Sequence, residues 1–269
     1  MQDNDYYLSA KELIGNPLTL ELRTLVNASK SLLTYGDIRY QLEVVDRDLN
    51  DNTKLLGLYN GVLLNATWDA GDTWDREHVW PNSRLGVPRI SNTQRGIASD
   101  LHNLRAATGS INSSKSDRFF SAGSGIASTT NDGGFYPGDD YKGDVARILF
   151  YMAVTYDYLV LTDDLAILLD ESFHYTEEGA RMGQLSLLLA WHKEDPVSAF
   201  EISRNEKIYT AQGNRNPFID RPEFVHLIWE NKTIADLEKP DIDNQDISYQ
   251  DNLITTLIKR RTLYGLIST

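Results

Sequence analysis

The residues best suited to chemistry lie between Trp74 and Phe120, where Glu77 and His78 are adjacent and Asn112 follows 34 positions after the histidine. A neutral imidazole, with an ordinary pKa of about 6.5, can take a proton from water near neutral pH. Carboxylate and amide oxygens are ligands that a hard divalent cation such as Mg²⁺ prefers. These residue types could therefore activate water beside a metal ion, which is the chemistry that phosphodiester hydrolysis requires.

The charge around these residues differs from that of the whole chain. Between Arg76 and Arg118 there are seven basic and three acidic residues, a local excess of +4, whereas the net charge of the chain is −13. An acidic chain argues against a general nucleic-acid binder. The local excess falls where a phosphate would bind, although a chance fluctuation in composition is the alternative explanation.

The composition excludes several other classes of protein. The 269 residues contain no cysteine, which rules out disulfides, thiolate catalysis and cysteine-ligated metal sites. The longest apolar run, Ile148 to Val154, is far shorter than the roughly 20 residues of a membrane-spanning helix. The polar start of the chain shows no export signal, so we expect either a cytoplasmic protein or an exported one whose signal was removed.

The elements that must position these residues are short. Helical spacing of apolar residues predicts a helix over Ile38–Val45. Asn60-Gly61 inside the apolar stretch Leu55–Ala66 predicts a turn between two strands. Trp74–Trp80 is expected to be a strand, and Asn112 to lie near the start of a short helix. Adjacent strand residues point to opposite faces, so Glu77 and His78 can share a metal only if it lies beside the strand with that helix packed across it.

The second half of the chain is expected to be mainly helical. Val145–Leu159 is apolar nearly all round and predicts a buried helix. Asp195-Pro196 has the pattern of an N-cap followed by proline at the first helical position, and Gly213 is expected to end that helix. The sequence predicts an α+β protein, mostly helical around a small antiparallel sheet, in one domain. Within residues 1–269 we expect an N-terminal arm (1–16), a catalytic segment (74–120) and a C-terminal extension (240–269).

Several spaced motifs resemble the endonuclease I family, a branch of the His-Me finger (ββα-metal) nucleases. The resemblance covers roughly residues 18–230, and several motifs in the right order are more specific than one short pattern. The matching motifs are Arg76-Glu77-His78-Val79-Trp80-Pro81, Asp100-x-His102-Asn103-Leu104, Asn112, Lys142-Gly143-Asp144-Val145-Ala146-Arg147, Trp191-His192, Asp195-Pro196-Val197-Ser198 and Gln212-Gly213-Asn214-Arg215-Asn216-Pro217.

The resemblance implies a metal-dependent endonuclease with a ββα-metal finger and little sequence preference. His78 would be the general base, and Glu77 and Asn112 would hold one divalent metal, Mg²⁺ in the first place and Mn²⁺ or Ca²⁺ as alternatives. The substrate would be DNA, with RNA as a further candidate, and the products would carry 5′-phosphate and 3′-hydroxyl ends. The family also implies a secreted or periplasmic protein, and we expect a monomer without membrane contact.

Basic and polar residues around this set are candidates for supporting roles. The phosphate-binding candidates are Arg76, Arg105, Lys115, Arg118, Arg147 and Arg215. The family usually has arginine three positions after the metal-binding asparagine, whereas this chain has Lys115 there and Arg118 one turn later, so either could meet the phosphate. Arg147 could instead neutralise a buried acid such as Glu201, and Arg215 could hold its own loop. Asp100, His102 and Asn103 are expected to orient the site rather than to bind the metal.

Two alternatives come from other classes of function. A zinc hydrolase, such as a peptidase, could use Glu77, His78 and His102, but the His-Glu-x-x-His spacing of helical zinc peptidases is absent from the sequence. A nucleic-acid-binding protein without catalytic activity is the other alternative, which the complete set of Glu77, His78 and Asn112 disfavours.

Overall fold

The computed structural model describes residues 6–237. Residues up to Lys232 form one compact unit, and Thr233 begins a second, whose described part is the short helix α11 (Ile234–Leu237). The helices of the first unit are α2 (Gly15–Ala28), α3 (Ile38–Val45), α4 (Gly109–Lys115), α5 (Lys142–Thr155), α6 (Leu165–Leu169), α7 (Leu185–Glu194), α8 (Ala199–Gln212), α9 (Pro217–Asp220) and α10 (Phe224–Trp229).

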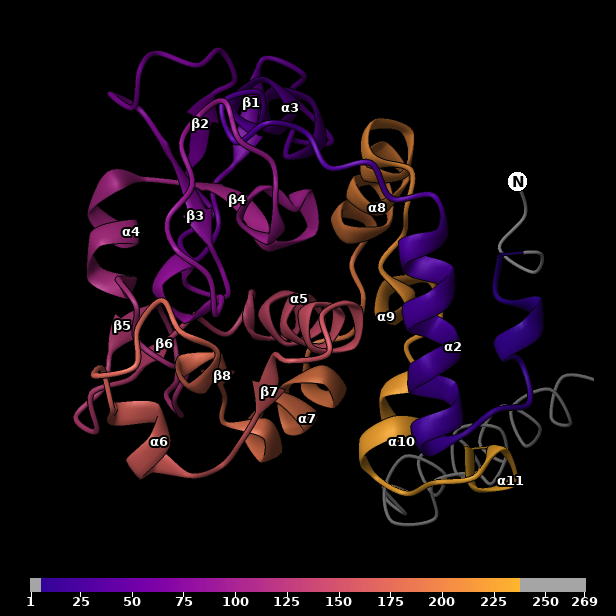
Figure 1. Cartoon of the computed structure of the whole chain (residues 1–269). Helices are drawn as coiled ribbons and strands as arrows, with labels where there is room; N and C mark the ends of the chain where they lie inside the picture. Colours follow the sequence, from indigo (N-terminus) through magenta and orange to yellow (C-terminus); the bar gives the residue numbers. More distant parts are fainter. Residues whose placement is uncertain (1–5, 238–269) are drawn as a thin grey trace, which may run out of the picture. The chain divides into compact units, whose positions relative to one another are not determined.

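The strands are short and pair two by two. They are β1 (Lys54–Leu56) with β2 (Leu63–Asn65), β3 (Asp75–His78) with β4 (Leu104–Ala107), β5 (Ser128–Thr129) with β6 (Phe135–Tyr136), and β7 (Val160–Leu161) with β8 (Arg181–Met182). The first three pairs are antiparallel and the last is parallel. The predicted class is therefore confirmed: the fold is α+β and mostly helical (Figure 1). The predicted extension 240–269 lies outside the described residues, and its membership of a single domain stays a prediction.

A hydrophobic core joins α3, the first hairpin, β4 and α8. Ile38, Leu42 and Val45 recur at helical spacing along α3 and are fully buried, so one face of this helix packs inward. The remaining buried members of the cluster come from the strands, their flanks and α8: Leu55, Leu64, Ala66, Trp74, Leu101, Leu104, Ala106 and Ile208. This core supports β4 and thereby fixes the strand that pairs with β3.

The loop of the first hairpin reaches the same sheet. The predicted turn at Asn60-Gly61 lies between β1 and β2, and Gly61 has a positive φ of 62°. Leu58 donates its backbone N–H to the carbonyl of Ala106 on β4, at 2.9 Å. Tyr59 has a φ of 76°, unusual for a non-glycine residue, and its side chain is buried. The hairpin therefore delivers the Tyr59 side chain to the interior beside β3 and β4.

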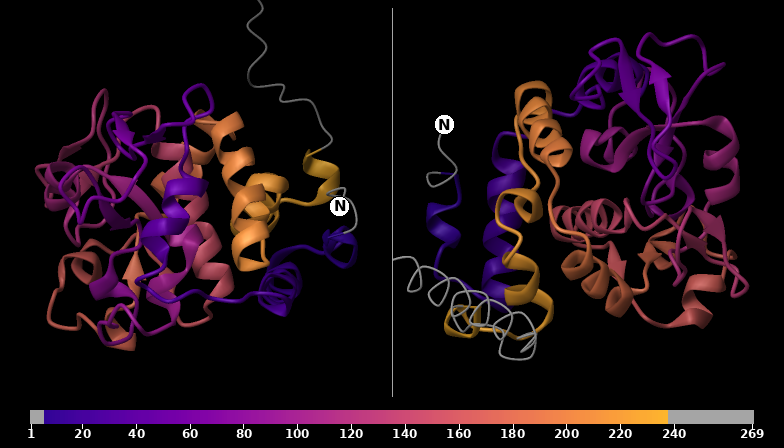
Figure 2. Two further views of the ribbon diagram at one scale, coloured as in Figure 1. Left: turned by 90° about the horizontal axis from the view of Figure 1, so that it is seen from above. Right: turned by 180° about the vertical axis from the view of Figure 1, so that it is seen from behind.

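Helix α5 is buried along almost its whole length, as its apolar composition predicts. It begins at Lys142 and ends at Thr155, so it starts and stops earlier than the expected range of 145–159. Helices α2 and α7 both pack against α5, and α10 lies beside α2 (Figure 2). None of the helices in the described range is both long and apolar enough to cross a membrane.

The start of α8 differs from the prediction. Ser198, not Asp195, is the N-cap: its hydroxyl accepts from the Glu201 N–H at 3.2 Å, and the Glu201 carboxylate accepts from the Ser198 N–H at 2.8 Å. This reciprocal capping box satisfies two backbone donors at once. The Asp195 carboxylate instead accepts from the Gly143 N–H in the first turn of α5, at 2.8 Å. Gly213 ends α8 in a left-handed conformation, φ 84°, as predicted.

The expected N-terminal arm is partly ordered where it is described. Leu8–Ala10 forms a 3₁₀ turn, and α2 already begins at Gly15, within the range assigned to the arm. The buried Tyr7 donates its hydroxyl to the Asp220 carboxylate at 2.8 Å.

Candidate active site

Strands β3 and β4 and helix α4 form a ββα unit. Antiparallel pairing places Glu77 opposite Arg105 and His78 opposite Leu104. Helix α4 packs against β3, as Figure 1 also shows. A 3₁₀ turn (Leu101–Asn103) leads directly into β4, which begins at Leu104.

One cleft brings the three residues singled out from the sequence together. Glu77, His78 and Asn112 all line this cleft, which has a volume of about 340 Å³. Because α4 packs against β3, Asn112 faces the same cleft as the end of that strand, where Glu77 and His78 are both buried. The other lining residues are Tyr35, Arg76, Pro81, Asn82, Ser83, Arg89, Ile90, Ser116, Asp117 and Tyr175.

The protonation of His78 is fixed by its surroundings. Its Nε2 lies 2.8 Å from the carbonyl oxygen of Ala98, and because a carbonyl only accepts, Nε2 carries the hydrogen. The other ring nitrogen, Nδ1, then has a free lone pair. Burial lowers the pKa of His78 to about 4, so the ring is neutral at ordinary pH. Tyr35 stacks on the imidazole, with ring centroids 5.5 Å apart, and restricts its rotation. The neutral ring, held in this way, can accept a proton at Nδ1.

Glu77 is a buried carboxylate held through one oxygen. Its Oε1 accepts a hydrogen bond of 2.8 Å from the Tyr59 hydroxyl, and Oε2 has no hydrogen-bond partner among the described residues. Burial raises the pKa of Glu77 to about 7, against the opposing charge of Lys115. The Lys115 side chain is fully buried, and its ammonium lies 4.8 Å from the centre of the Phe120 ring. Burial lowers the pKa of Lys115 to about 8.

The donor set fits a hard divalent cation. Glu77 offers a carboxylate oxygen and Asn112 an amide oxygen, and the Asn112 side chain makes no hydrogen bond to another described residue. No group of three or more His, Cys, Asp or Glu side chains suited to a metal occurs within residues 6–237. Such a sparse set suits Mg²⁺, which takes one or two protein ligands and keeps its waters, rather than zinc held in a protein cage.

The zinc alternative also required His102, which lies elsewhere. His102 is buried and is not among the residues that line the cleft. Its Nε2 lies 3.3 Å from the Asn214 carbonyl oxygen, its ring packs on Tyr151, and burial lowers its pKa to about 4. The structure therefore gives no support to a site made of Glu77, His78 and His102.

Asp100 and Asn103 hold the turn between the two strands. The Asn103 side chain accepts from the backbone N–H of Trp80 at 2.7 Å and donates to its carbonyl at 3.0 Å. Asp100 accepts hydrogen bonds of 2.8 Å from the hydroxyls of Tyr151 and Tyr156. Neither side chain lines the cleft.

Of the six candidate phosphate ligands, Arg76 alone lines the cleft. Its guanidinium lies 3.8 Å from the centre of the Tyr35 ring and donates to the Tyr35 carbonyl. Lys115 is buried behind the cleft next to Glu77. Arg118 donates to the Ser114 carbonyl at 2.8 Å, at the end of α4. The sequence left Lys115 and Arg118 as alternatives for the phosphate, and the structure lines the cleft with neither.

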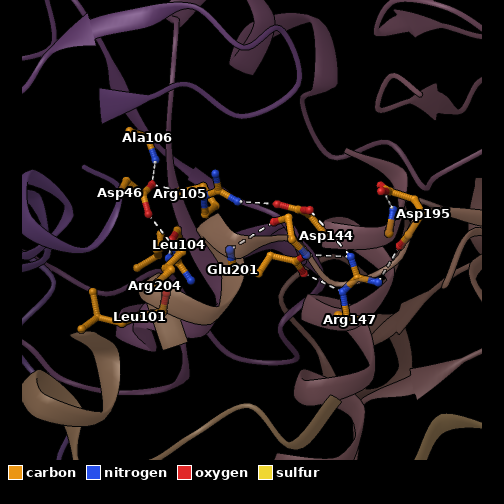
Figure 3. Close-up of polar contacts among 12 residues, drawn as sticks. Asp46, Leu101, Leu104, Arg105, Ala106, Asp144, Arg147, Asp195, Glu201 and Arg204 are labelled. Carbon is orange, nitrogen blue, oxygen red and sulfur yellow. Dashed lines mark hydrogen bonds and ion pairs between the residues drawn. The ribbon is translucent and has the colours of Figure 1, made fainter. Parts of the chain in front are cut away.

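The other three arginines are held in ion pairs away from the cleft. Arg105 and Arg147 belong to a buried ion network, formed by Asp46, Arg105, Asp144, Arg147, Glu201 and Arg204 (Figure 3). Arg215 pairs with Asp220 at 2.7 Å and with Glu206 at 2.5 Å. The structure thus favours the loop-holding role for Arg215 and the pairing with Glu201 for Arg147. It corrects the assignment of Arg105 to the phosphate, because the Arg105 guanidinium is paired with carboxylates inside the protein.

Several cleft residues carry no recognisable sequence signal. Arg89 donates to the Tyr175 hydroxyl at 3.0 Å, and both side chains line the cleft. Asn82 and Ser83 follow the His78 motif by a few positions but match no pattern by themselves. Tyr59, which donates a hydrogen bond to Glu77 without lining the cleft, lies in a stretch for which the sequence predicted only a turn between two strands. In the sequence, only the local excess of basic residues around Arg89 pointed to any of these residues.

Known proteins similar to this chain agree with the geometry. The model of the Endonuclease I family matches residues 30–223. The chain is 35% identical over 235 residues to an extracellular ribonuclease of Bacillus subtilis (strain 168), covering 83% of this chain and 78% of the relative. It is 36% identical, with the same coverage, to an extracellular ribonuclease of Bacillus amyloliquefaciens. Endonuclease-1 of Buchnera aphidicola (subsp. Baizongia pistaciae, strain Bp) is 26% identical over 137 residues, 46% of each chain. With its ββα unit and its cleft, this chain belongs to the endonuclease I family and is a nuclease.

Proposed function

We propose that the protein is a metal-dependent endonuclease that cleaves RNA and DNA with little sequence preference and leaves 5′-phosphate and 3′-hydroxyl ends. The observation that carries the proposal is the shared cleft of Glu77, His78 and Asn112 on one ββα unit. RNA is included as a principal substrate because the two Bacillus relatives are named extracellular ribonucleases. The same names support secretion.

His78 has the central role in the proposed reaction. Its Nδ1 takes a proton from a water molecule, which attacks the phosphorus atom. The bond from phosphorus to the 3′-oxygen breaks, and that oxygen is protonated to give the 3′-hydroxyl end. The hydrogen bond from Nε2 to the Ala98 carbonyl, 2.8 Å, keeps the ring oriented and helps to carry the positive charge that develops on it.

Glu77 and Asn112 would hold the metal, which we take to be Mg²⁺, with Mn²⁺ or Ca²⁺ as alternatives. When bound, it supplies charge neutralisation at the phosphoryl oxygens and at the leaving oxygen. Arg76 and Arg89 line the cleft and attract the phosphate backbone. The net charge of −13 makes this local attraction necessary and predicts strongly salt-sensitive binding.

A digestion panel tests the proposal. RNA, single-stranded DNA and plasmid DNA are each incubated with Mg²⁺, Mn²⁺ or Ca²⁺, with and without chelator, and the product ends are identified by mass spectrometry. We expect cleavage that requires a divalent metal and that falls by about 10²–10⁴-fold in His78→Ala. His226→Ala is the matched control, because His226 lies on α10 outside the cleft. Full activity of His78→Ala would show the mechanism to be wrong, and binding without cleavage in every metal would favour a silent nucleic-acid binder.

A further inference from the structure

Two tyrosines line the active-site cleft, and their rings are used differently. The Tyr35 ring stacks on His78, with planes at 26°, and lies 3.8 Å from the Arg76 guanidinium. The half-buried Tyr175 contacts no other aromatic ring in the described part of the chain. We infer that the Tyr175 ring is a stacking platform for an unpaired nucleobase of the substrate, next to a phosphate bound by Arg89. This inference rests on the proposed nuclease function.

The backbone holds Tyr175 at the edge of the cleft. Its N–H donates to the carbonyl of Ser83 at 2.6 Å, and Ser83 is itself a cleft residue. The preceding His174 lies beside Asp117, another cleft residue, with Nδ1 3.6 Å from Oδ2. Tyr175 also has a φ of 64°, a left-handed conformation that is uncommon for a residue other than glycine. Such conformations cluster where a protein binds ligands, because the surrounding structure must enforce them.

Arg89 meets Tyr175 at the hydroxyl end of the ring. The Arg89 guanidinium donates to the Tyr175 hydroxyl at 3.0 Å, and its carbon lies 5.9 Å from the centre of the ring. The corresponding distance in the stacked pair of Arg76 and Tyr35 is only 3.8 Å. Arg89 therefore does not cover the centre of the Tyr175 ring face. Its guanidinium has five N–H donors, and this hydrogen bond uses one of them.

A cation beside an uncovered aromatic ring fits one nucleotide. The exposed Arg89 offers donors and positive charge to phosphate oxygens, which only accept hydrogen bonds. An aromatic ring stacks on a nucleobase, and because every base has a π-face, such stacking is compatible with little sequence preference. Ile90 lines the same cleft and adds apolar surface next to Arg89. The geometry thus assigns the phosphate to Arg89 and the base to Tyr175.

This subsite predicts a preference for single-stranded nucleic acid, whether DNA or RNA. A base inside a duplex is paired and stacked between its neighbours, so its face is not free, whereas a base in a single strand can be splayed onto an aromatic side chain. Stacking of one base is worth about tenfold in binding. Because the contact forms when the substrate binds, we expect the preference in KM rather than in kcat.

Removal of single bases from the substrate tests the inference. The full-length protein with Mg²⁺ cleaves a single-stranded oligothymidylate with one central abasic site, and a denaturing gel resolves every product. Thymines stack weakly on one another, so the missing base hardly alters the strand itself. We expect the wild type to cleave a linkage beside the abasic site about tenfold more slowly than the same linkage of the intact oligomer.

Three variants assign this effect to the ring. In Tyr175→Leu the difference between the abasic and the intact oligomer should fall below about twofold. Tyr175→Phe keeps the ring and loses only the hydroxyl, so it should keep the difference. Tyr40→Leu is the matched control, because Tyr40 is 53% exposed on α3 and lies outside the cleft. Persistence of the difference in Tyr175→Leu, or its loss in Tyr175→Phe, would overturn the platform; the second result would leave Tyr175 only the role of holding Arg89.

A measurement on the wild type alone keeps the test decisive if Tyr175→Leu does not fold. One thymine is replaced by 5-iodouracil, the complex is irradiated in chelator, and the cross-linked peptide is identified by mass spectrometry. We expect the cross-link on Tyr175. Cross-links only to other residues, or equal cleavage of the abasic and the intact oligomer at every linkage, would overturn the inference. Absence of cleavage of any oligomer by the wild type would instead refute the nuclease proposal itself.

Discussion

The cleft and the buried ion network are built from the same residue types but use them in opposite ways. Glu77 and Arg105 are direct partners across β3 and β4. Glu77 accepts a hydrogen bond from a tyrosine hydroxyl through one oxygen, and its other oxygen has no hydrogen-bond partner among the described residues. Arg105, in contrast, forms ion pairs with Asp46 and Asp144, both at 3.2 Å. The two paired strands therefore differ: β3 carries a carboxylate with one uncommitted oxygen, whereas β4 carries a guanidinium that is already paired with two carboxylates.

The arginines show the same contrast. In the network, Arg147 forms a two-pronged pair with Glu201, at 2.5 and 2.8 Å, and is fully buried. In the cleft, Arg76 and Arg89 rest against tyrosine rings and form no ion pair with a described carboxylate. A cation already paired with an acid cannot serve a phosphate without breaking that pair. The comparison shows that pairing, rather than the presence of a basic residue, separates binding groups from structural ones.

The largest expected effect tests the network. Arg147→Ala should lower the free energy of unfolding by about 3–5 kcal/mol, because it leaves Glu201 buried without its partner. Chemical denaturation measures the loss, and kcat/KM of the folded protein at low temperature should stay within about threefold of wild type. Arg147→Met combined with Glu201→Gln should recover a large part of the stability, since no unpaired charge is then buried. An increase in KM at unchanged stability would instead assign Arg147 to the substrate.

The next effect tests the cleft through Tyr59. Tyr59→Phe keeps the ring, which packs on Phe135 with centroids 5.1 Å apart, but removes the hydroxyl that holds Glu77. Groups that orient a metal ligand typically change metal affinity by tenfold or more, so we expect Mg²⁺ affinity to fall about tenfold by calorimetry. Tyr136→Phe is the matched control, because its hydroxyl also donates to a carboxylate, Asp139, outside the cleft. Equal affinity in Tyr59→Phe and wild type would contradict the positioning role.

The pH dependence of metal binding tests whether the buried Glu77 carboxylate binds the cation. Burial raises the pKa of this carboxyl to about 7, so it is ionised above pH 7 and protonated below. Only the ionised form holds a cation, and Mg²⁺ affinity should therefore fall about tenfold per pH unit below pH 7. His78 stays neutral throughout this range because its pKa is about 4. Calorimetry between pH 6 and 8 measures the slope, and an affinity that does not change with pH would contradict the burial of Glu77 in solution.

Local sequence signals explain what could be predicted of the fold. The α3 helix begins and ends at the predicted residues, because three apolar positions at helical spacing lie within eight residues. The first hairpin follows from Asn60-Gly61. The start of α8 was misplaced because two capping signals lie three residues apart, and only the contact of Asp195 with Gly143, 52 positions earlier, decides between them.

The composition of the site was less predictable, because its contacts are distant in sequence. Glu77, His78 and Asn112 could be named from their types and from family motifs, but the structure adds Tyr59, Tyr175 and Arg89 without any such signal. Arg105 was assigned to the phosphate because no sequence pattern reveals that Asp46, 59 positions earlier, lies beside it. Pairing of this kind is a property of the packed fold.

The smallest expected effect is a difference in KM between variants of two arginines at the protein surface, Arg89 and Arg118. Arg89→Ala should raise KM about three- to fivefold at low salt. This difference in KM from the wild type should shrink as the salt concentration rises to about 0.2 M, because salt screens the attraction between Arg89 and the phosphates. Arg118→Ala should leave KM within about twofold, because its guanidinium is used at the end of α4, 2.8 Å from the Ser114 carbonyl. Steady-state kinetics over a salt series measures both. The opposite result, a salt-dependent KM change in Arg118→Ala alone, would mean that the phosphate approaches from the end of α4 and that pairing does not identify the binding groups of this cleft.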